Sequence, residues 1–187
     1  MLYFTSDLHF YHKRIIEYCQ RPFENVSEMN AILIENWNKT VQPKDDVIIL
    51  GDFCFGTKAK WRNILNQLNG TKYLIIGNHD KDDQIPNEMF ESVGYYDEIN
   101  YEKRKFCLMH YPIESWNTAF RGGYQLHGHI HSKDKAIHRV CKTGIFENNP
   151  GGNEEEIKYG VRMDVGVDAW NYYPVSINEI IRIGENI

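Results

Sequence analysis

The sequence predicts an α/β fold, because β-prone and helix-prone segments alternate along its first 76 residues. Segments 47–50 and 73–76 are continuous apolar runs, as expected for strands that are buried on both faces of a sheet. Between them, residues 58–68 place Trp61 and Leu65 on one face of a helix, which Asn69-Gly70 would end. This alternation favours parallel pairing of the strands.

The N-terminal elements follow in the same order. A first strand is expected at residues 2–6, and a short helix at 13–20 that ends before Pro22, because proline disfavours helix in the preceding residue. A longer helix is expected at 27–39, with Ser27 as its N-cap. Together with the strands at 47–50 and 73–76, these elements form the predicted parallel core.

The second half of the chain is predicted to contain three strands and a capped helix: 105–109, 124–127, 163–167 and 176–182. Segment 133–160 contains an Asn-Pro-Gly turn and a run of glutamates, so we interpret it as an excursion from the core. A hairpin, a surface loop and a lid are the alternatives for this excursion. A length of 187 residues favours a single domain spanning residues 1–187.

Composition restricts the classes of function. The net charge of −5 disfavours electrostatic binding of long nucleic acid, although a metal ion could still attract a small nucleotide. The four cysteines are widely spaced, without a CxxC pair, which favours reduced thiols in a cytoplasmic protein. The sequence shows no signal peptide, and no apolar run approaches the ~20 residues of a membrane span. We therefore expect no membrane partner.

Polar side chains that can bind metals follow the predicted strands, at the point where each strand ends. Five turns carry them: Asp7-Leu8-His9, Gly51-Asp52, Gly77-Asn78-His79-Asp80, His110 and Gly128-His129-Ile130-His131. Turns after the carboxyl ends of parallel strands gather at one edge of a sheet. Carboxylate, imidazole and amide oxygen suit first-row divalent ions, and the glycines would let the backbone turn sharply and bring the ligands close.

These five blocks, in this order, resemble the motifs of the calcineurin-like metallophosphoesterases. The resemblance covers residues 1 to about 131 by motif, and the short form of the chain is similar to small bacterial and phage members. It implies a four-layer α/β/β/α sandwich with two divalent ions. One ion would be held by Asp7, His9, Asp52 and His131, and the other by Asp52, Asn78, His110 and His129. Asp52 would then bridge the two ions.

The chemistry implied by the resemblance is hydrolysis of a phosphoester. Two ions ~3.5–4 Å apart can bind the phosphoryl oxygens, and a bridging water can lose a proton to become the hydroxide nucleophile. His79 would protonate the leaving oxygen, with Asp80 orienting its ring; alternatively, Asp80 caps the following turn. Manganese is the metal we expect first, with iron, zinc, nickel or cobalt as alternatives.

Other polar residues near these blocks have less defined roles. His12 and Asn78 are candidates for contacts with the substrate phosphate, although His12 is equally consistent with a surface residue. Arg14 and Arg21 are interpreted as salt-bridge or surface residues, with contact to the substrate phosphate as the alternative. Asp168, after the last predicted strand, is expected to have a mainly structural role.

The predicted function is hydrolysis of a small phosphoester or nucleotide by a phosphodiesterase or phosphatase. A nuclease on longer DNA or RNA and a non-catalytic metal-binding scaffold are the alternatives. A protein phosphatase is disfavoured, because that branch carries an arginine shortly after its Gly-Asp block, whereas Phe53 and Cys54 follow Asp52 here. The natural substrate, the preference for monoester or diester, and the oligomeric state are left open.

Overall fold

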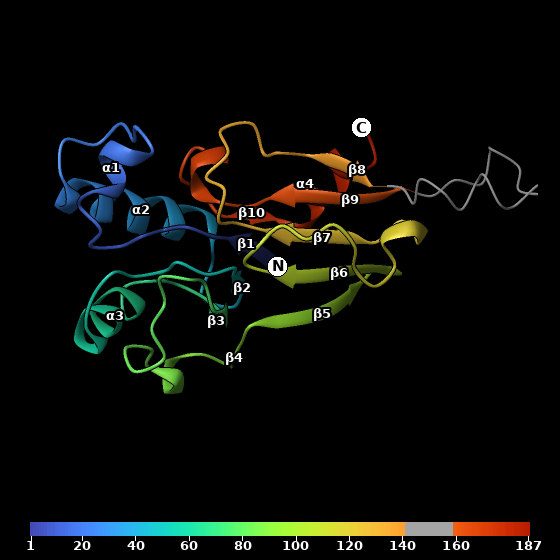
Figure 1. The fold of residues 1–187 in the computed structure, drawn as a ribbon. Coiled ribbons are helices and arrows are strands. Elements are labelled where there is room, and N and C mark those ends of the chain that lie inside the picture. The colour runs from blue at the N-terminus through green and yellow to red at the C-terminus, as the bar shows by residue number, and fades with distance from the viewer. Residues whose placement is uncertain (141–158) are drawn as a thin grey trace, which may run out of the picture.

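The computed structural model of the chain describes residues 1–140 and 159–187, which form two five-stranded sheets packed face to face (Figure 1). The first sheet has the order β10-β1-β2-β3-β4. Its strands are β1 (Leu2–Thr5), β2 (Asp46–Ile49), β3 (Thr71–Ile75), β4 (Ser92–Gly94) and β10 (Val175–Ser176). Strands β1 to β4 are parallel, as predicted for β1, β2 and β3, and β10 is antiparallel.

The second sheet has the order β5-β6-β7-β9-β8. Its strands are β5 (Tyr96–Tyr101), β6 (Arg104–Met109), β7 (Tyr124–His127), β8 (His138–Val140) and β9 (Gly160–Asp164). The three central strands are parallel, and the two edge strands are antiparallel. The two described ends of the predicted excursion thus pair as β8 and β9. The lid alternative falls on residues 141–158, outside the described residues.

Helices and short turns complete the layers. The helices are α1 (Ile15–Tyr18), α2 (Val26–Thr40), α3 (Lys58–Leu65) and α4 (Ile177–Gly184), with 3-10 turns η1 (Asn87–Met89), η2 (Ala119–Arg121) and η4 (Val167–Ala169). The described helices include none long and apolar enough to cross a membrane. The outer face of the second sheet is covered by a thin layer, in which Trp116 and Ala119 pack on Cys107.

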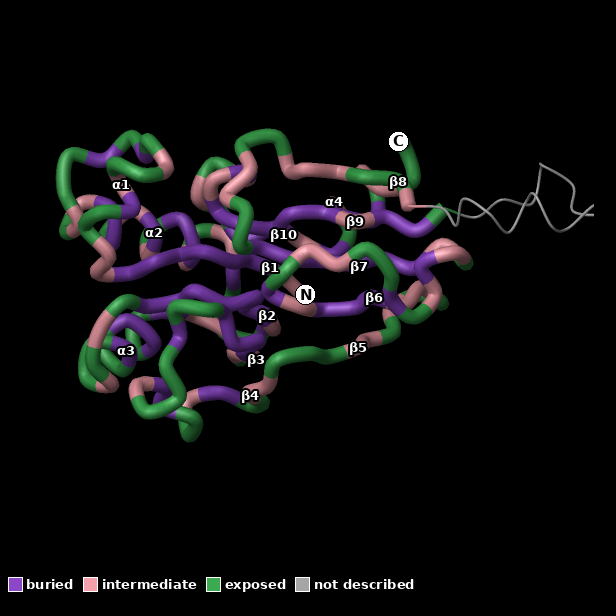
Figure 2. Tube along the Cα trace, viewed as in Figure 1, coloured by how far each residue is buried: buried purple, intermediate pink, exposed green. Residues whose placement is uncertain are grey.

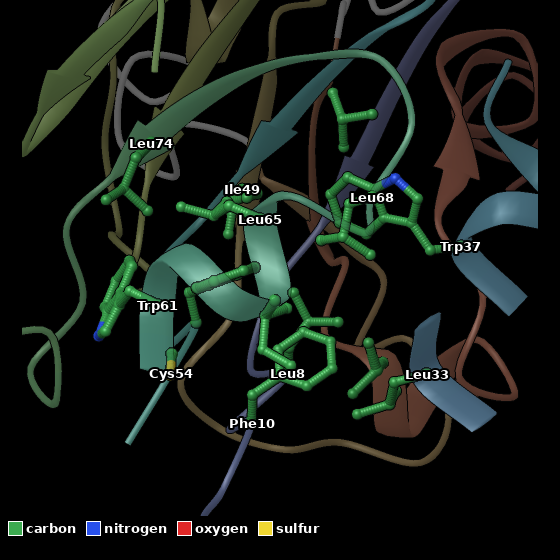
Figure 3. Close-up of a cluster of buried hydrophobic side chains, with 14 of the residues drawn as sticks. Leu8, Phe10, Leu33, Trp37, Ile49, Cys54, Trp61, Leu65, Leu68 and Leu74 are labelled. Carbon is green, nitrogen blue, oxygen red and sulfur yellow. The ribbon is translucent and has the colours of Figure 1, made fainter. Parts of the chain in front are cut away.

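Two cores hold the layers together. Helices α2 and α3 pack on the outer face of the first sheet, where Trp37 and Trp61 meet Ile49 and other apolar side chains (Figure 3). The second core lies between the sheets and contains Phe4 from β1 and Phe106 from β6. Burial therefore runs along the central strands, whereas the edge strand β5 is largely exposed (Figure 2). The two-sheet α/β architecture implied by the resemblance is confirmed; within the described residues, its fourth layer contains the 3-10 turn η2 rather than an α-helix.

Three local predictions need comment. The N-cap of α2 is Asn25 rather than Ser27, because the Asn25 side chain accepts the N–H groups of Ser27 and Glu28. The predicted Ser176 cap of α4 is confirmed by its bond from the Glu179 N–H. The strand expected at 163–167 is shifted to Gly160–Asp164, because the chain then leaves the second sheet to pair with the end of β1.

Candidate metal centre

All seven candidate metal ligands lie together at the carboxyl ends of strands from both sheets. The turns after β1, β2 and β3 carry Asp7, His9, Asp52 and Asn78, and those after β6 and β7 carry His110, His129 and His131. Backbone bonds connect the turns, since the His9 N–H donates to Asp52 O at 2.9 Å. The His129 N–H donates to Asp7 Oδ2 at 2.9 Å, which joins the two sheets.

The first set of ligand atoms surrounds His9. The Nε2 of His9 lies 3.3 Å from Nε2 of His131 and 3.5 Å from Oδ2 of Asp52. The same nitrogen of His131 lies 3.6 Å from Oδ1 of Asp7. Asp7, His9 and Asp52 are buried, with 0%, 2% and 2% of their surfaces exposed. Four donor atoms thus converge in an enclosed space.

The second set surrounds Asn78. Its Oδ1 lies 2.8 Å from Nε2 of His110 and 2.9 Å from Nδ1 of His129. The Nε2 of His110 lies 3.6 Å from Oδ2 of Asp52. Asp52 Oδ2 is therefore close to a histidine of each set.

The donor set fits divalent cations. Metal–ligand bonds of about 2.1 Å place neighbouring ligands ~3.0 Å apart in an octahedron and ~3.4 Å apart in a tetrahedron, close to the separations above. The Nδ1–H of His110 donates to Leu50 O at 2.7 Å, and the Nδ1–H of His131 donates to Asp168 Oδ2 at 2.8 Å. In the neutral form of each ring, the Nε2 lone pair is then free to bind a metal.

Burial changes the protonation of the first set. Removal from water raises the pKa of Asp7 to about 7 and lowers the pKa of His9 well below its usual value. Burial also disfavours the charged form of His131, but hydrogen bonds with Asp168 and Cys19 and the charge of Asp7 raise its pKa to about 10. Both shifts favour the protonated forms of Asp7 and His131, so a metal bound by these residues would displace protons.

Five of the seven candidate ligands have a left-handed backbone. Their φ angles are 56° at Asp7, 52° at His9, 54° at Asp52, 72° at His129 and 47° at His131. Non-glycine residues adopt this region infrequently and at an energetic cost, and such residues concentrate at functional sites. The cross-turn bonds described above hold these conformations in place.

The glycines before the ligands act in two different ways. Gly51 has a φ of +91°, which confirms the predicted sharp turn. Gly77 and Gly128 instead permit close approach. A Cβ at Gly77 would overlap the Asp52 carboxylate, and one at Gly128 would overlap the Asp7 carboxylate. These glycines therefore bring the ligands close without providing a left-handed turn.

The contacts of Asp80 differ from the orienting role that we expected. Its carboxylate is buried and accepts the backbone N–H groups of Asp52, Phe53 and Gly77 at 2.7–3.0 Å. Within the described residues it forms no hydrogen bond with the ring of His79. Asp80 therefore connects the turns after β2 and β3. Burial raises its pKa to about 6, despite the opposing effect of these backbone bonds.

Asp168 has a role that sequence reasoning missed. It accepts the His131 Nδ1–H, and its other partner is Arg21, which binds both of its carboxylate oxygens at 2.8–2.9 Å. Arg21 forms the predicted salt bridge and also donates to the backbone oxygens of Asp7 and Leu8. The available signal was position, since Asp168 follows a predicted strand as the ligands do.

His79 and His12 lie beside the first set. The exposed ring of His79 is 5.4 Å from the ring of His9, measured between centroids, and its backbone N–H donates to Asp52 Oδ1 at 2.8 Å. The Nδ1 of His12 lies 3.3 Å from Nδ1 of His9. Both histidines line a cavity of about 480 Å³ next to the centre. Asn78 is exposed within its own set.

Comparison with known proteins identifies the family of this chain. The model of the calcineurin-like phosphoesterase family matches residues 2–157. The chain belongs to this family. An uncharacterised protein of Methanocaldococcus jannaschii is 38% identical over 98% of this chain and 91% of its own length. The gene 66 protein of Mycobacterium phage L5 is 27% identical over 99% of this chain and 94% of its own length.

A solved structure agrees at the level of the fold. A protein of unknown function from Aquifex aeolicus superposes with a TM-score of 0.70 and 26% identity, and 98% of each chain is covered. Family membership also establishes the class of reaction. As a calcineurin-like phosphoesterase, the chain is a metal-dependent phosphoester hydrolase.

Proposed function

We propose that this phosphoesterase binds two divalent ions and hydrolyses a small phosphoester. The observation that carries the proposal is the position of Asp52 Oδ2, which lies 3.5 Å from a histidine nitrogen of the first set and 3.6 Å from one of the second. A carboxylate shared by two ligand sets suits a pair of ions, because it reduces their repulsion. Manganese is the metal that we propose for both sets.

The ions and the protein residues would have different roles. When bound, two such ions would supply positive charge for the phosphoryl oxygens and would make a water acidic enough to lose a proton and attack phosphorus. The protein residues would position these groups: Asp80 and Arg21 hold the ligand turns, and the exposed Asn78 faces the solvent from which substrate arrives. His79, whose exposed ring lies beside the first set, would give a proton to the leaving oxygen as a general acid.

Three further properties bear on the proposal. The net charge of −5 gives little electrostatic attraction for long nucleic acid, which supports a small substrate. The described cysteines, Cys19, Cys54 and Cys107, are free thiols, which suits a reducing compartment such as the cytoplasm. Both sheets supply candidate ligands and share a core, which supports one catalytic domain.

A panel assay tests the proposal. Metal-free protein would be supplied separately with manganese, iron, zinc, nickel or cobalt and assayed on bis-p-nitrophenyl phosphate, p-nitrophenyl phosphate and cyclic nucleotides. Metal content would be measured by plasma mass spectrometry. We expect two ions per chain and hydrolysis that chelation abolishes. A protein that binds two ions but hydrolyses no phosphoester would instead be a scaffold, and one ion per chain at full activity would contradict the shared carboxylate.

A further inference from the structure

The cavity beside the centre has an unusual wall. It measures about 480 Å³, a size typical of small-molecule sites, and it opens next to His9 and His79. Two of its lining side chains, Tyr18 and Phe55, are large aromatic groups that are 60% and 45% exposed. Single exposed aromatic residues are ordinary, but two at one cavity next to a reactive centre suggest a contact surface for a ligand.

The rings of this wall are close enough to act together. The ring of His12 stacks on Phe55, with centroids 4.3 Å apart and an interplanar angle of 13°. Phe55 lies 6.0 Å from the ring of His79, and His12 lies 6.5 Å from Tyr18. An aromatic surface therefore extends from His79 outward along the cavity. We call Tyr18, Phe55 and His12 the aromatic wall.

Positive charge lies at the outer end of the aromatic wall. The Arg14 guanidinium is 5.2 Å from the centroid of the Tyr18 ring, and Lys13 also lines the cavity. Neither cation forms an ion pair within the part of the chain that the structure describes. Both are exposed and available to an electron-rich ring or to an anionic group.

The ring of His12 also contacts the first ligand set. Its Nδ1 lies 3.3 Å from Nδ1 of His9, and its other ring nitrogen, Nε2, lies at the opposite edge of the ring. A polar ring edge therefore lies beside the aromatic surface.

We propose that this cavity is a subsite for the planar heterocyclic ring of a nucleoside leaving group. The inference rests on the proposed function, because His79 would protonate the leaving oxygen on this side of the centre. The base would stack on the aromatic wall, with Arg14 near its outer edge. Nucleoside phosphoesters are then favoured over phosphoesters of the same sugar without a base.

Paired ligands isolate the contribution of the base. The phosphonate analogues of adenosine 5′-monophosphate and ribose 5-phosphate have methylene in place of the bridging ester oxygen and cannot be hydrolysed. They differ at C1′, where the first carries the base and the second a hydroxyl group. Their affinities for the manganese-loaded protein would be measured by titration calorimetry. We expect the adenosine analogue to bind about 5-fold more tightly or better, the lower range of base–aromatic stacking. Equal affinities would overturn the subsite.

Variants then test the wall. Phe55→Ala and, separately, Tyr18→Ala should bring the affinity ratio toward one, while the ribose analogue keeps its affinity within about twofold. Tyr173→Ala is the matched control, because Tyr173 is an exposed aromatic residue in a separate hollow with Tyr3 and Pro174. The subsite is wrong if both wall variants, with wild-type melting temperatures, keep the full ratio.

Hydrolysis of bis-p-nitrophenyl phosphate by the wild-type protein separates the two proposals. If manganese-loaded protein hydrolyses this ester but does not distinguish the two analogues, the subsite fails and the proposed function stands. If the ester is not hydrolysed under any metal, the proposed function fails, and the phosphonate titrations then report only whether the cavity binds a base.

Discussion

The two ligand sets differ in enclosure. In the first, Asp7 and His9 are buried, and the His131 side chain is 19% exposed. In the second, Asn78 and His129 are both exposed. The sets share Asp52, yet the first is mostly enclosed, whereas the second faces solvent apart from the buried His110.

Supporting contacts explain this difference. Behind the first set, Arg21 binds the backbone of Asp7 and both oxygens of Asp168, and Asp168 orients His131. In the second set, Asn78 and His129 contact each other, and His110 is held by a backbone oxygen. Since outer partners fix ligand orientation, we infer that the first set binds its ion tightly, whereas the second exchanges its ion more readily.

The largest expected effect comes from Asp52→Asn, which touches both sets. It should lower metal content at both and reduce turnover by more than the roughly 100-fold cost of losing an outer partner. Metal content per chain and kcat on bis-p-nitrophenyl phosphate are the measurements. A variant that keeps two ions and full turnover would show that the sets do not share this carboxylate.

His79→Ala sharpens the comparison, because His79 lies beside the enclosed set without being a candidate ligand. Metal content should stay near wild type. Turnover of esters with poor leaving groups should fall on the order of 10²- to 10⁴-fold, whereas esters of p-nitrophenol should be slowed much less. A series of aryl esters with rising leaving-group pKa would measure this. Equal slowing across the series would argue against a general acid.

Asp168→Asn tests the support of the enclosed set alone. Loss of this outer partner should weaken binding of the first ion about 10- to 100-fold while the second ion is unaffected. Two-site calorimetric titration of metal-free protein measures both constants. Asp97→Asn, a change on the exposed part of β5, is the control and should alter neither constant. If Asp168→Asn weakened both sites equally, the two sets would not be independently supported.

The pH dependence of metal binding should also separate the sets. The pKa of His131 is raised to about 10 and that of Asp7 to about 7, so the first ion displaces one proton between these two values and two protons at lower pH. Its affinity should rise with pH by about tenfold per unit for each proton released. The lowered pKa of His129 leaves that ligand neutral at pH 7. Titrations at several pH values would contradict this difference if both sites showed the same slope.

Much of the centre was predictable because its signals are local. Each candidate ligand lies one to four residues after the end of a strand, and strands such as 47–50 are recognised from a few consecutive residues. The support of the first set was not predictable in this way. Arg21 and Asp168 are separated by 147 residues and meet only because the second sheet folds over the first. No local pattern encodes that contact.

The division of the strands between two sheets could not be predicted from the strand pattern either. Parallel buried strands have similar sequences in either sheet, so their partners cannot be read from them. Strand β5 (Tyr96–Tyr101) was missed because it is an edge strand with mostly polar and exposed residues. The apolar run at 163–167 misplaced β9, because Val165 and Val167 are buried outside the sheet.

The left-handed backbone of five candidate ligands also restricts how this centre could change during evolution. Asparagine, aspartate, histidine and glycine tolerate such φ angles better than branched or bulky residues do. A replacement at His129 or His131 therefore has to suit the backbone before it can suit a metal. A change of metal preference would therefore require substitutions among these few residue types. Substitutions at His110 and Asn78 are the exception, because the backbones of these two residues are not left-handed.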